Sequence, residues 1–415
     1  MAKAAAYAAR ATARDDSSDF AWRMRLVIDL QAKRYGPAID TLERMTQGRG
    51  AALNSVPPKW LWQTRAVLDS AHDDVNLLRL LRIMSDSAYQ PDDLGWEIDN
   101  SGDTARTTYA RKLVGAGRKD EARALLVDLK GYGALDQVAF DPDLRALFGR
   151  PIDLRAVVEA DLIQHRALME KYPRSLAALN AVASDLRRLG RNDEMIAMLK
   201  AAISQAESTG AYDDRDDNLP WFWNSLAYAY AAAGKYDDMV VAFGKGAALN
   251  ESGMPNVSQV INLSGQQNAF DRPKDALATI TPISIKADAS PYGLMQIHLA
   301  RGCAYARLSD LANARADLAY LLAHEPDAPP AVSLIQMCLD NEDATAASFV
   351  RRLGDPRTRE MAMRDLTDYD APDPRGPISP IAPLFERVRK RSDVQAAIRA
   401  AGGPFRVHLQ YDPLY

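Results

Sequence analysis

The chain has 415 residues, of which 47% are hydrophobic and 26% are charged, and its formal net charge is −4. This composition excludes an intrinsically disordered chain, because it supplies ample apolar side chains for a buried core. The slight excess of acidic residues argues against a general electrostatic affinity for nucleic acid.

The N-terminus carries no clear targeting signal. The first ten residues are rich in alanine, but Lys3 and Arg10 interrupt the apolar core that a secretory signal needs. We therefore expect a frayed helix here and, for the sequence as written, a cytoplasmic location. The alternative is an exported, periplasmic protein whose signal has been removed. No apolar run reaches about 18 residues, so we expect no transmembrane segment.

Apolar residues recur at helical spacing in pairs of segments separated by short turns, which predicts a helical repeat. In chain order these segments are 20–46, 60–85, 104–130, 153–171, 176–206, 219–250, 257–284 and 294–326. The clearest pair is 219–250, where Asn218 is a candidate N-cap and Pro220 lies near the first helical position. Gly234 ends its first helix, and the second helix runs on to Leu249.

This pair resembles the tetratricopeptide repeat (TPR). The matching residues are Trp223, Leu226, Ala227, Tyr230, Gly234, Tyr236 and Phe243, whereas Met239 replaces a small residue of the family pattern. Over residues 20–325 the resemblance implies an all-α fold, an α-α superhelix of antiparallel helix pairs. Met239 lies 44 residues after Met195, more than the family period of about 34. We therefore expect extra loops between pairs, such as 208–218.

The C-terminal part changes character. Residues 331–352 are a further helix pair or a cap, and 365–383 are rich in Pro, Asp and Gly, which predicts a loop. An amphipathic helix at 383–400 and a short strand at 405–411 follow. We expect this tail to cap the array, with a partner-docking tail as the alternative. The predicted divisions of the chain are 1–100, 101–352 and 353–415.

Motifs for catalysis and metal binding are missing from the sequence. The five histidines form no paired helical spacing, and there is no Walker loop or Gly-x-Ser-x-Gly elbow. The acidic run 213–217 lacks calcium-ligand spacing, so we expect a solvated loop. Cys303 and Cys338 are expected to be buried free thiols. We predict no catalytic residue, metal or cofactor, although an enzyme with a site dispersed over several repeats stays as an alternative.

In the TPR family the first helices line a concave face, and the resemblance implies a ligand site there. Asn180 and Asn224 fall at the same place in successive pairs, and Asn262 is displaced by about one residue. A row of amides can hold an extended peptide backbone, because each both donates and accepts. The alternative is ordinary polar surface or hydrogen bonding between helices.

Arginines and aromatic residues complete the candidate site. The arginines expected on the concave side, Arg111, Arg187, Arg188 and Arg307, favour a carboxylate or acidic peptide. Alternatively they are solvated and paired with acidic neighbours, as with Asp185 beside Arg188. Tyr228 lies on the same face as Asn224. Adjacent rings cannot all point inward, so Trp221, next to Phe222 and Trp223, is a candidate exposed contact.

These observations predict a non-catalytic scaffold that binds a protein or peptide partner, and no nucleic acid, in the concave groove of a superhelix. A carrier that holds a small molecule or lipid inside the superhelix is the first alternative. A dispersed enzyme and a homo-oligomer formed by stacking of repeat edges are the others.

Overall fold

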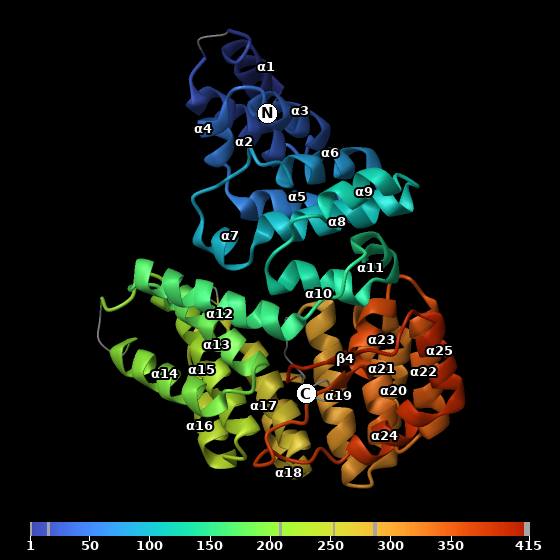
Figure 1. Ribbon diagram of the computed structural model, residues 1–415. Coiled ribbons are helices and arrows are strands. Elements are labelled where there is room, and N and C mark those ends of the chain that lie inside the picture. Colours follow the sequence, from blue (N-terminus) through green and yellow to red (C-terminus); the bar gives the residue numbers. More distant parts are fainter. Residues whose placement is uncertain (1, 15–16, 207–209, 252–253, 285–288, 411–415) are drawn as a thin grey trace. The chain divides into compact units, whose positions relative to one another are not determined.

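The computed structural model describes residues 2–14, 17–206, 210–251, 254–284 and 289–410 (Figure 1). Almost all regular structure in this part of the chain is helical, which confirms the predicted all-α class. The chain divides into two compact units, Met1–Ile152 and Asp153–Tyr415, here called the N-terminal and C-terminal units. None of its described helices is long and apolar enough to cross a membrane.

The N-terminal unit contains three helix pairs with short helices between them. Its elements are α1 (Ala2–Ala11), α2 (Asp19–Gln31), α3 (Tyr35–Thr46), α4 (Gly50–Asn54), α5 (Pro58–Ser70), α6 (Asp74–Met84), α7 (Leu94–Ile98), α8 (Ser101–Gly115), α9 (Lys119–Leu125), α10 (Tyr132–Phe140) and α11 (Pro142–Phe148). The pairs α2–α3, α5–α6 and α8–α9 match the predicted segments 20–46, 60–85 and 104–130. Buried leucine and isoleucine side chains such as Leu26 and Ile39 hold them together.

The C-terminal unit continues the pairs and ends in the tail. Its helices are α12 (Leu154–Lys171), α13 (Leu176–Arg188), α14 (Asn192–Ala206), α15 (Arg215–Ala232), α16 (Tyr236–Ala247), α17 (Val257–Ala269), α18 (Pro273–Ser284), α19 (Pro291–Arg307), α20 (Leu311–Ala323), η1 (Glu325–Asp327), α21 (Pro329–Cys338), α22 (Glu342–Gly354), α23 (Arg359–Leu366), α24 (Ala382–Lys390) and α25 (Ser392–Ala400). Two small sheets join β1 (Asn250–Glu251) to β2 (Met254–Pro255) and β3 (Asp368–Tyr369) to β4 (Arg406–Val407). Successive helices from α12 to α22 pack against each other, as a helical solenoid requires.

The strongest predicted pair, 219–250, needs two corrections. Helix α15 begins at Arg215, so Asn218 is not its N-cap and Pro220 lies inside the helix; the Asn218 side chain donates to the carbonyl of Asp214 instead. The fully buried ring is Phe222, while Trp223 is only partly buried against the same core. The remaining residues of the predicted stripe, Leu226, Ala227 and Tyr230, are buried as expected.

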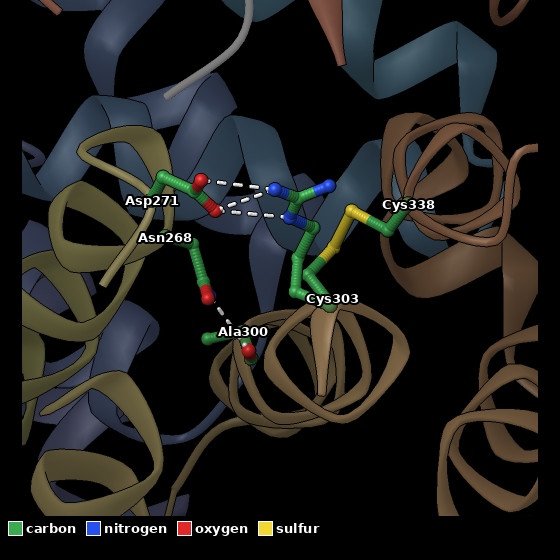
Figure 2. The surroundings of a disulfide bond; sticks show 6 residues. Asn268, Asp271, Ala300, Cys303 and Cys338 are labelled. Atoms are coloured by element: carbon green, nitrogen blue, oxygen red, sulfur yellow. Dashed lines mark hydrogen bonds and ion pairs between the residues drawn. A yellow bond between two sulfur atoms is a disulfide. The ribbon is translucent and has the colours of Figure 1, made fainter. Parts of the chain in front are cut away.

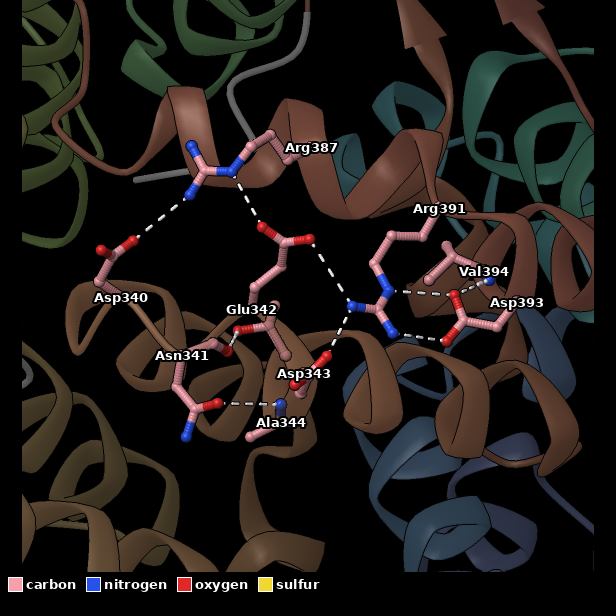
Figure 3. Close-up of polar contacts among 10 residues, drawn as sticks. Asp340, Asn341, Glu342, Asp343, Ala344, Arg387, Arg391, Asp393 and Val394 are labelled. Atoms are coloured by element: carbon pink, nitrogen blue, oxygen red, sulfur yellow. Dashed lines mark hydrogen bonds and ion pairs between the residues drawn. The ribbon is translucent and has the colours of Figure 1, made fainter.

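The predicted helix 383–400 is in fact two helices, α24 and α25, with Arg391 extended between them. Arg391 binds Asp343 at 2.7 Å and Asp393 at 2.9 Å, and Arg387 binds Glu342 at 2.9 Å (Figure 3). Glu342 and Asp343 lie at the start of α22 and Asp393 lies in α25, so the break at Arg391 coincides with a cluster of ion pairs. Together α24 and α25 cover α22, so the tail caps the array as expected.

The cysteines are not free thiols, which corrects the prediction. Cys303 of α19 and Cys338 of α21 form a disulfide, with Cα atoms 5.1 Å apart (Figure 2). Their separation of 35 residues is close to one repeat, so the two side chains come from first helices of successive pairs. In the same view Asn268 donates to the carbonyl of Ala300, which joins α17 to α19. The sequence contains no sign of this disulfide, because its two cysteines are 35 residues apart and form no Cys-x-x-Cys motif.

Candidate partner-binding surface

Three first helices of the C-terminal unit, α13, α15 and α17, are linked by a ladder of polar side chains. The Ser225 hydroxyl donates to the side-chain oxygen of Asn180 at 3.1 Å, and the Asn262 amide donates to the side-chain oxygen of Asn224 at 2.9 Å. The bonds tie α15 to both neighbours and bring the three predicted asparagines into one row. All three asparagines of this row are half-buried.

The ladder uses the amide oxygens and leaves two amide nitrogens. Among the described residues, the side-chain nitrogens of Asn180 and Asn224 have no hydrogen-bond partner. Neither nitrogen is fully buried, so each can donate to water or to a ligand. The row can therefore both stabilise the helix packing and donate to carbonyl oxygens of a ligand.

The acidic run 213–217 orients α13 and is not simply a solvated loop. The Asp214 carboxylate accepts from the backbone N–H groups of Leu176 and Ala177 at 2.7 and 2.9 Å, and from the Ser175 hydroxyl at 2.8 Å. A carboxylate is favourable at a helix N-terminus, where backbone N–H groups lack partners within the helix. This contact fixes the start of the helix that carries Asn180.

Beyond the ladder, toward the C-terminal ends of α13 and α15, a cation lies over an aromatic ring. The guanidinium carbon of Arg187 is 4.6 Å from the centre of the Tyr228 ring, and that ring meets Phe243 edge-on at 5.4 Å. Arg187 is exposed and has no carboxylate partner among the described residues. It keeps its charge available to a ligand while the ring holds its stem in place.

The other predicted residues are placed differently. Arg188 binds Asp185 at 3.2 Å and Arg307 binds Asp271 at 2.7 Å, so both carry local acidic partners. Arg111 belongs to the N-terminal unit, where it binds Asp141 at 2.9 Å. Trp221 is half-buried on α15, three residues before Asn224 and on the same face of that helix.

The tail returns to this face, a contact that the sequence does not reveal. We call residues 370–377 and 408–410 the strap. The Gln410 N–H donates to the carbonyl of Arg188 at 2.7 Å, and the Asn192 amide donates to Asp373 at 3.4 Å. Arg375 binds Asp193 at 3.0 Å. The strap thus lies against the turn between α13 and α14.

Two repeat glycines make this contact possible. Gly190 and Gly234 have φ values of +71° and +72°, which only glycine adopts readily. A Cβ at Gly234 would lie 1.9 Å from the carbonyl oxygen of Arg375, and one at Gly190 would lie 2.6 Å from the Gln410 side chain. Each glycine therefore both follows a helix end and makes room for the strap, Gly234 for its backbone and Gly190 for the Gln410 side chain.

A cavity of about 90 Å³ remains between the strap and the helices. It is lined by Arg187, Tyr228, Gln266, Asp373, Pro377 and Gln410, among others. The hydrogen bonds from Arg375 hold the pKa of Asp373 well below its usual range, against the opposing effect of burial. Asp373 is therefore anionic at neutral pH, and the cavity can hold a few water molecules.

Two buried clusters contain histidine and aspartate side chains but line neither the cavity nor the groove described below. The ring nitrogen Nδ1 of His165 lies 2.5 Å from Asp185, and that of His298 lies 2.7 Å from Asp317. Burial raises the pKa of Asp317, yet hydrogen bonds from His298 and Arg301 outweigh it and leave the pKa below its usual value. Both clusters tie neighbouring helices together. Within the described ranges no group of three or more side chains could hold a metal ion.

The N-terminal unit has a groove of its own between α2 and α5, with a volume of about 420 Å³. Its walls include Val27, Leu30, Tyr35, Trp60 and Val67, with Gln31, Gln63 and Thr64 as polar members. Sequence reasoning missed it because both helices belong to weak copies of the repeat. The sequence does contain a signal for the groove, because α2 and α5 carry apolar residues, such as Val27 and Val67, in addition to those that fill the core.

Comparisons with known proteins show little beyond the helical architecture. No protein-family profile matches the chain, and no curated protein matches it. One similar solved structure is that of Naa15/Naa10 bound to HypK-THB, with 11% sequence identity and a TM-score of 0.25; the match covers 80% of this chain and 57% of that chain. Another is that of yeast Tom70, with 12% sequence identity and a TM-score of 0.21; the match covers 93% of this chain and 98% of Tom70. This chain spans 57% of the first of these, and neither likeness carries an argument about function.

Proposed function

We propose that the protein is a non-catalytic scaffold that binds an extended peptide of a partner protein across α13, α15 and α17. The observation that carries this proposal is the pair of amide nitrogens on Asn180 and Asn224, which face no acceptor among the described residues. Two such donors in successive helices suit the carbonyl groups of a peptide backbone.

The charge on this face favours an acidic partner segment. Arg187 is the predicted arginine that lacks a carboxylate partner within the described part of the chain. A charge-assisted hydrogen bond contributes about 1.5–3 kcal/mol. A peptide carboxylate at Arg187, with its backbone on the asparagine row, would satisfy all three groups at once.

The first test is affinity capture from source-organism lysate, read by mass spectrometry, with the wild type and an Asn180→Ala/Asn224→Ala variant. Losing two neutral hydrogen bonds should weaken partner capture by roughly 5- to 150-fold, at about 0.5–1.5 kcal/mol each. Lys200→Ala, an exposed change on α14, is the matched control and should capture normally. Equal capture by the double variant and wild type would rule out the asparagine row.

Charge reversal at Arg187 tests the acidic character of the partner. Arg187→Glu should weaken binding of the captured partner at least roughly tenfold, because it replaces an attraction by a repulsion. Lys200→Glu makes the same charge change on the second helix of the pair and should leave affinity unchanged. If both variants bind alike in a titration calorimeter, the partner does not use Arg187.

The groove of the N-terminal unit supports a second candidate function, the binding of a small apolar molecule. Its volume of about 420 Å³ falls within the range of roughly 300–1,000 Å³ that is usual for ligand pockets. Native mass spectrometry of the purified protein would test this by revealing a bound mass that organic extraction removes. Trp60→Ala, which removes one wall of the groove, should lose that mass, and its retention would exclude the groove.

A further inference from the structure

The strap has the features of a bound ligand. It is a Pro- and Gly-rich segment with a turn at 373–376, where the Gly376 N–H donates to the Asp373 carbonyl at 2.9 Å, and it meets the helices mainly through an anchored Asp–Arg pair and backbone contacts. Asp373 accepts from Asn192, while Arg375 binds Asp373 at 2.6 Å and Asp193 at 3.0 Å. Repeat surfaces that offer both side-chain and backbone partners can hold a peptide segment in this way.

The receiving surface is built for a close backbone approach. The Arg375 carbonyl sits where a Cβ of Gly234 would be, and Gly376 would meet the carbonyl of Ala232 at 2.9 Å if it carried a Cβ. Glycine is therefore needed on both sides of this contact. A ligand that fits here must place a glycine directly after its arginine, as the strap does.

We infer that the turns α13–α14 and α15–α16 form a docking site for a partner segment of the type Asp-Pro-Arg-Gly-Pro, and that the strap occupies this site until such a segment displaces it. The inference rests on the proposed peptide-binding function and extends it to a defined sequence chemistry. The site borders Arg187 and Tyr228, which line the cavity under the strap. A partner that displaces the strap would therefore gain direct access to both residues.

The strap is attached in a way that permits exchange. Its ion pairs are largely at the surface, since the side chains of Arg375 and Asp193 are 47% and 71% exposed. Exposed pairs are individually weak and break readily. Residues 370–377 of the strap form a loop between α23 and α24, so the release of these residues does not require the cap helices to leave α22.

The test uses a fluorescent synthetic peptide with the sequence of residues 368–380 and the full-length protein. The variant Asp373→Ala/Arg375→Ala removes the anchors of the strap and leaves the receiving surface intact. Fluorescence anisotropy should show saturable binding to this variant at least tenfold tighter than to wild type, where the strap competes. A peptide with alanine in place of its Asp373 and Arg375 should bind neither protein.

Two further measurements keep the inference falsifiable. Asp193→Ala in the released background should weaken peptide binding severalfold, because Asp193 is the partner of the arginine. In wild-type protein, excess peptide should accelerate hydrogen exchange across residues 370–377, a readout that needs no variant to fold. Failure of the peptide to bind the folded, released variant, or equal binding of the alanine peptide, would overturn the inference.

Failure of the strap peptide to bind and failure of the proposed scaffold function give different results. If the peptide does not bind but partner capture still depends on Asn180 and Asn224, the scaffold function stands and the strap is only structural. If the peptide binds and capture is independent of the asparagines, the docking site stands and the asparagine row is not the ligand surface.

Discussion

At the residue scale, several polar groups of this protein pair with residues about one repeat away. Asn262 reaches Asn224 from 38 residues along the chain, and Tyr236 donates to Asp275 from 39 residues away. The bond to Asp275, together with burial as the larger cause, raises the pKa of Tyr236 to about 12. The repeat period therefore predicts partners as well as helices, although only the asparagine row was recognised in this way from the sequence.

The residue-scale limits of sequence reasoning have the same origin. The sequence predicts that Arg307 faces a ligand, but Asp271, which lies 36 residues earlier in the turn after α17, forms an ion pair with it. The separation of 36 residues is close to one repeat, so the repeat spacing would have predicted this ion pair. No local pattern, by contrast, places Gln410 against Arg188, because the tail crosses more than two hundred residues of chain to reach it.

The depressed pKa of Asp373 predicts how strap docking depends on pH. A carboxylate whose folded-state pKa lies below its unfolded value of about 3.9 stabilises the fold above that pH, and the contribution is lost as pH falls through the folded-state pKa. The melting temperature of wild type should therefore exceed that of Asp373→Asn by a constant margin above about pH 5. The margin should shrink below about pH 4. A margin that grows on acidification would contradict the pairing with Arg375.

At the element scale, helix existence follows from periodicity, but breaks and covalent links depend on tertiary partners. Residues 383–400 contain neither proline inside the run nor glycine, yet the chain breaks at Arg391, whose side chain binds Asp343 of α22. In the same way, Cys303 and Cys338 read as apolar helix residues until the stacking of α19 on α21 brings them together.

The disulfide should contribute measurably to the stability of the C-terminal unit. Closing a loop with a separation of 35 residues lowers the entropy of the unfolded chain and adds about 3–4 kcal/mol in the chain-entropy description. A Cys303→Ala/Cys338→Ala variant should lose about this much unfolding free energy in urea titrations. Reducing agent should destabilise the wild type similarly and leave the variant unchanged. Two titratable thiols in unreduced, denatured wild-type protein would show that the bridge does not form.

At the scale of the whole molecule, the chain is two compact helical units, each with its own buried core. The predicted boundaries at 100 and 352 followed repeat quality along the sequence and stay predictions, whereas contacts divide the chain after Ile152. The cap, the strap and the asparagine row all belong to the C-terminal unit. The proposed partner-binding surface therefore lies entirely within residues 153–415.

This arrangement predicts which part of the chain captures the partner. A fragment of residues 153–415 should fold alone, with a cooperative thermal transition in circular dichroism, and should retain partner capture. The fragment 1–152 should also be helical but should capture nothing that depends on Asn180 or Asn224. Capture by the N-terminal fragment alone would transfer the scaffold function to the groove between α2 and α5.

The most direct test of the central claim is hydrogen–deuterium exchange of the full chain, alone and in complex with the captured partner. If the first helices carry the partner, added protection should concentrate in α13, α15 and α17, and exchange should rise in the strap residues 370–377. Protection confined to α14 and α16, or to the N-terminal unit, with unchanged exchange at α13, α15 and α17, would contradict the claim.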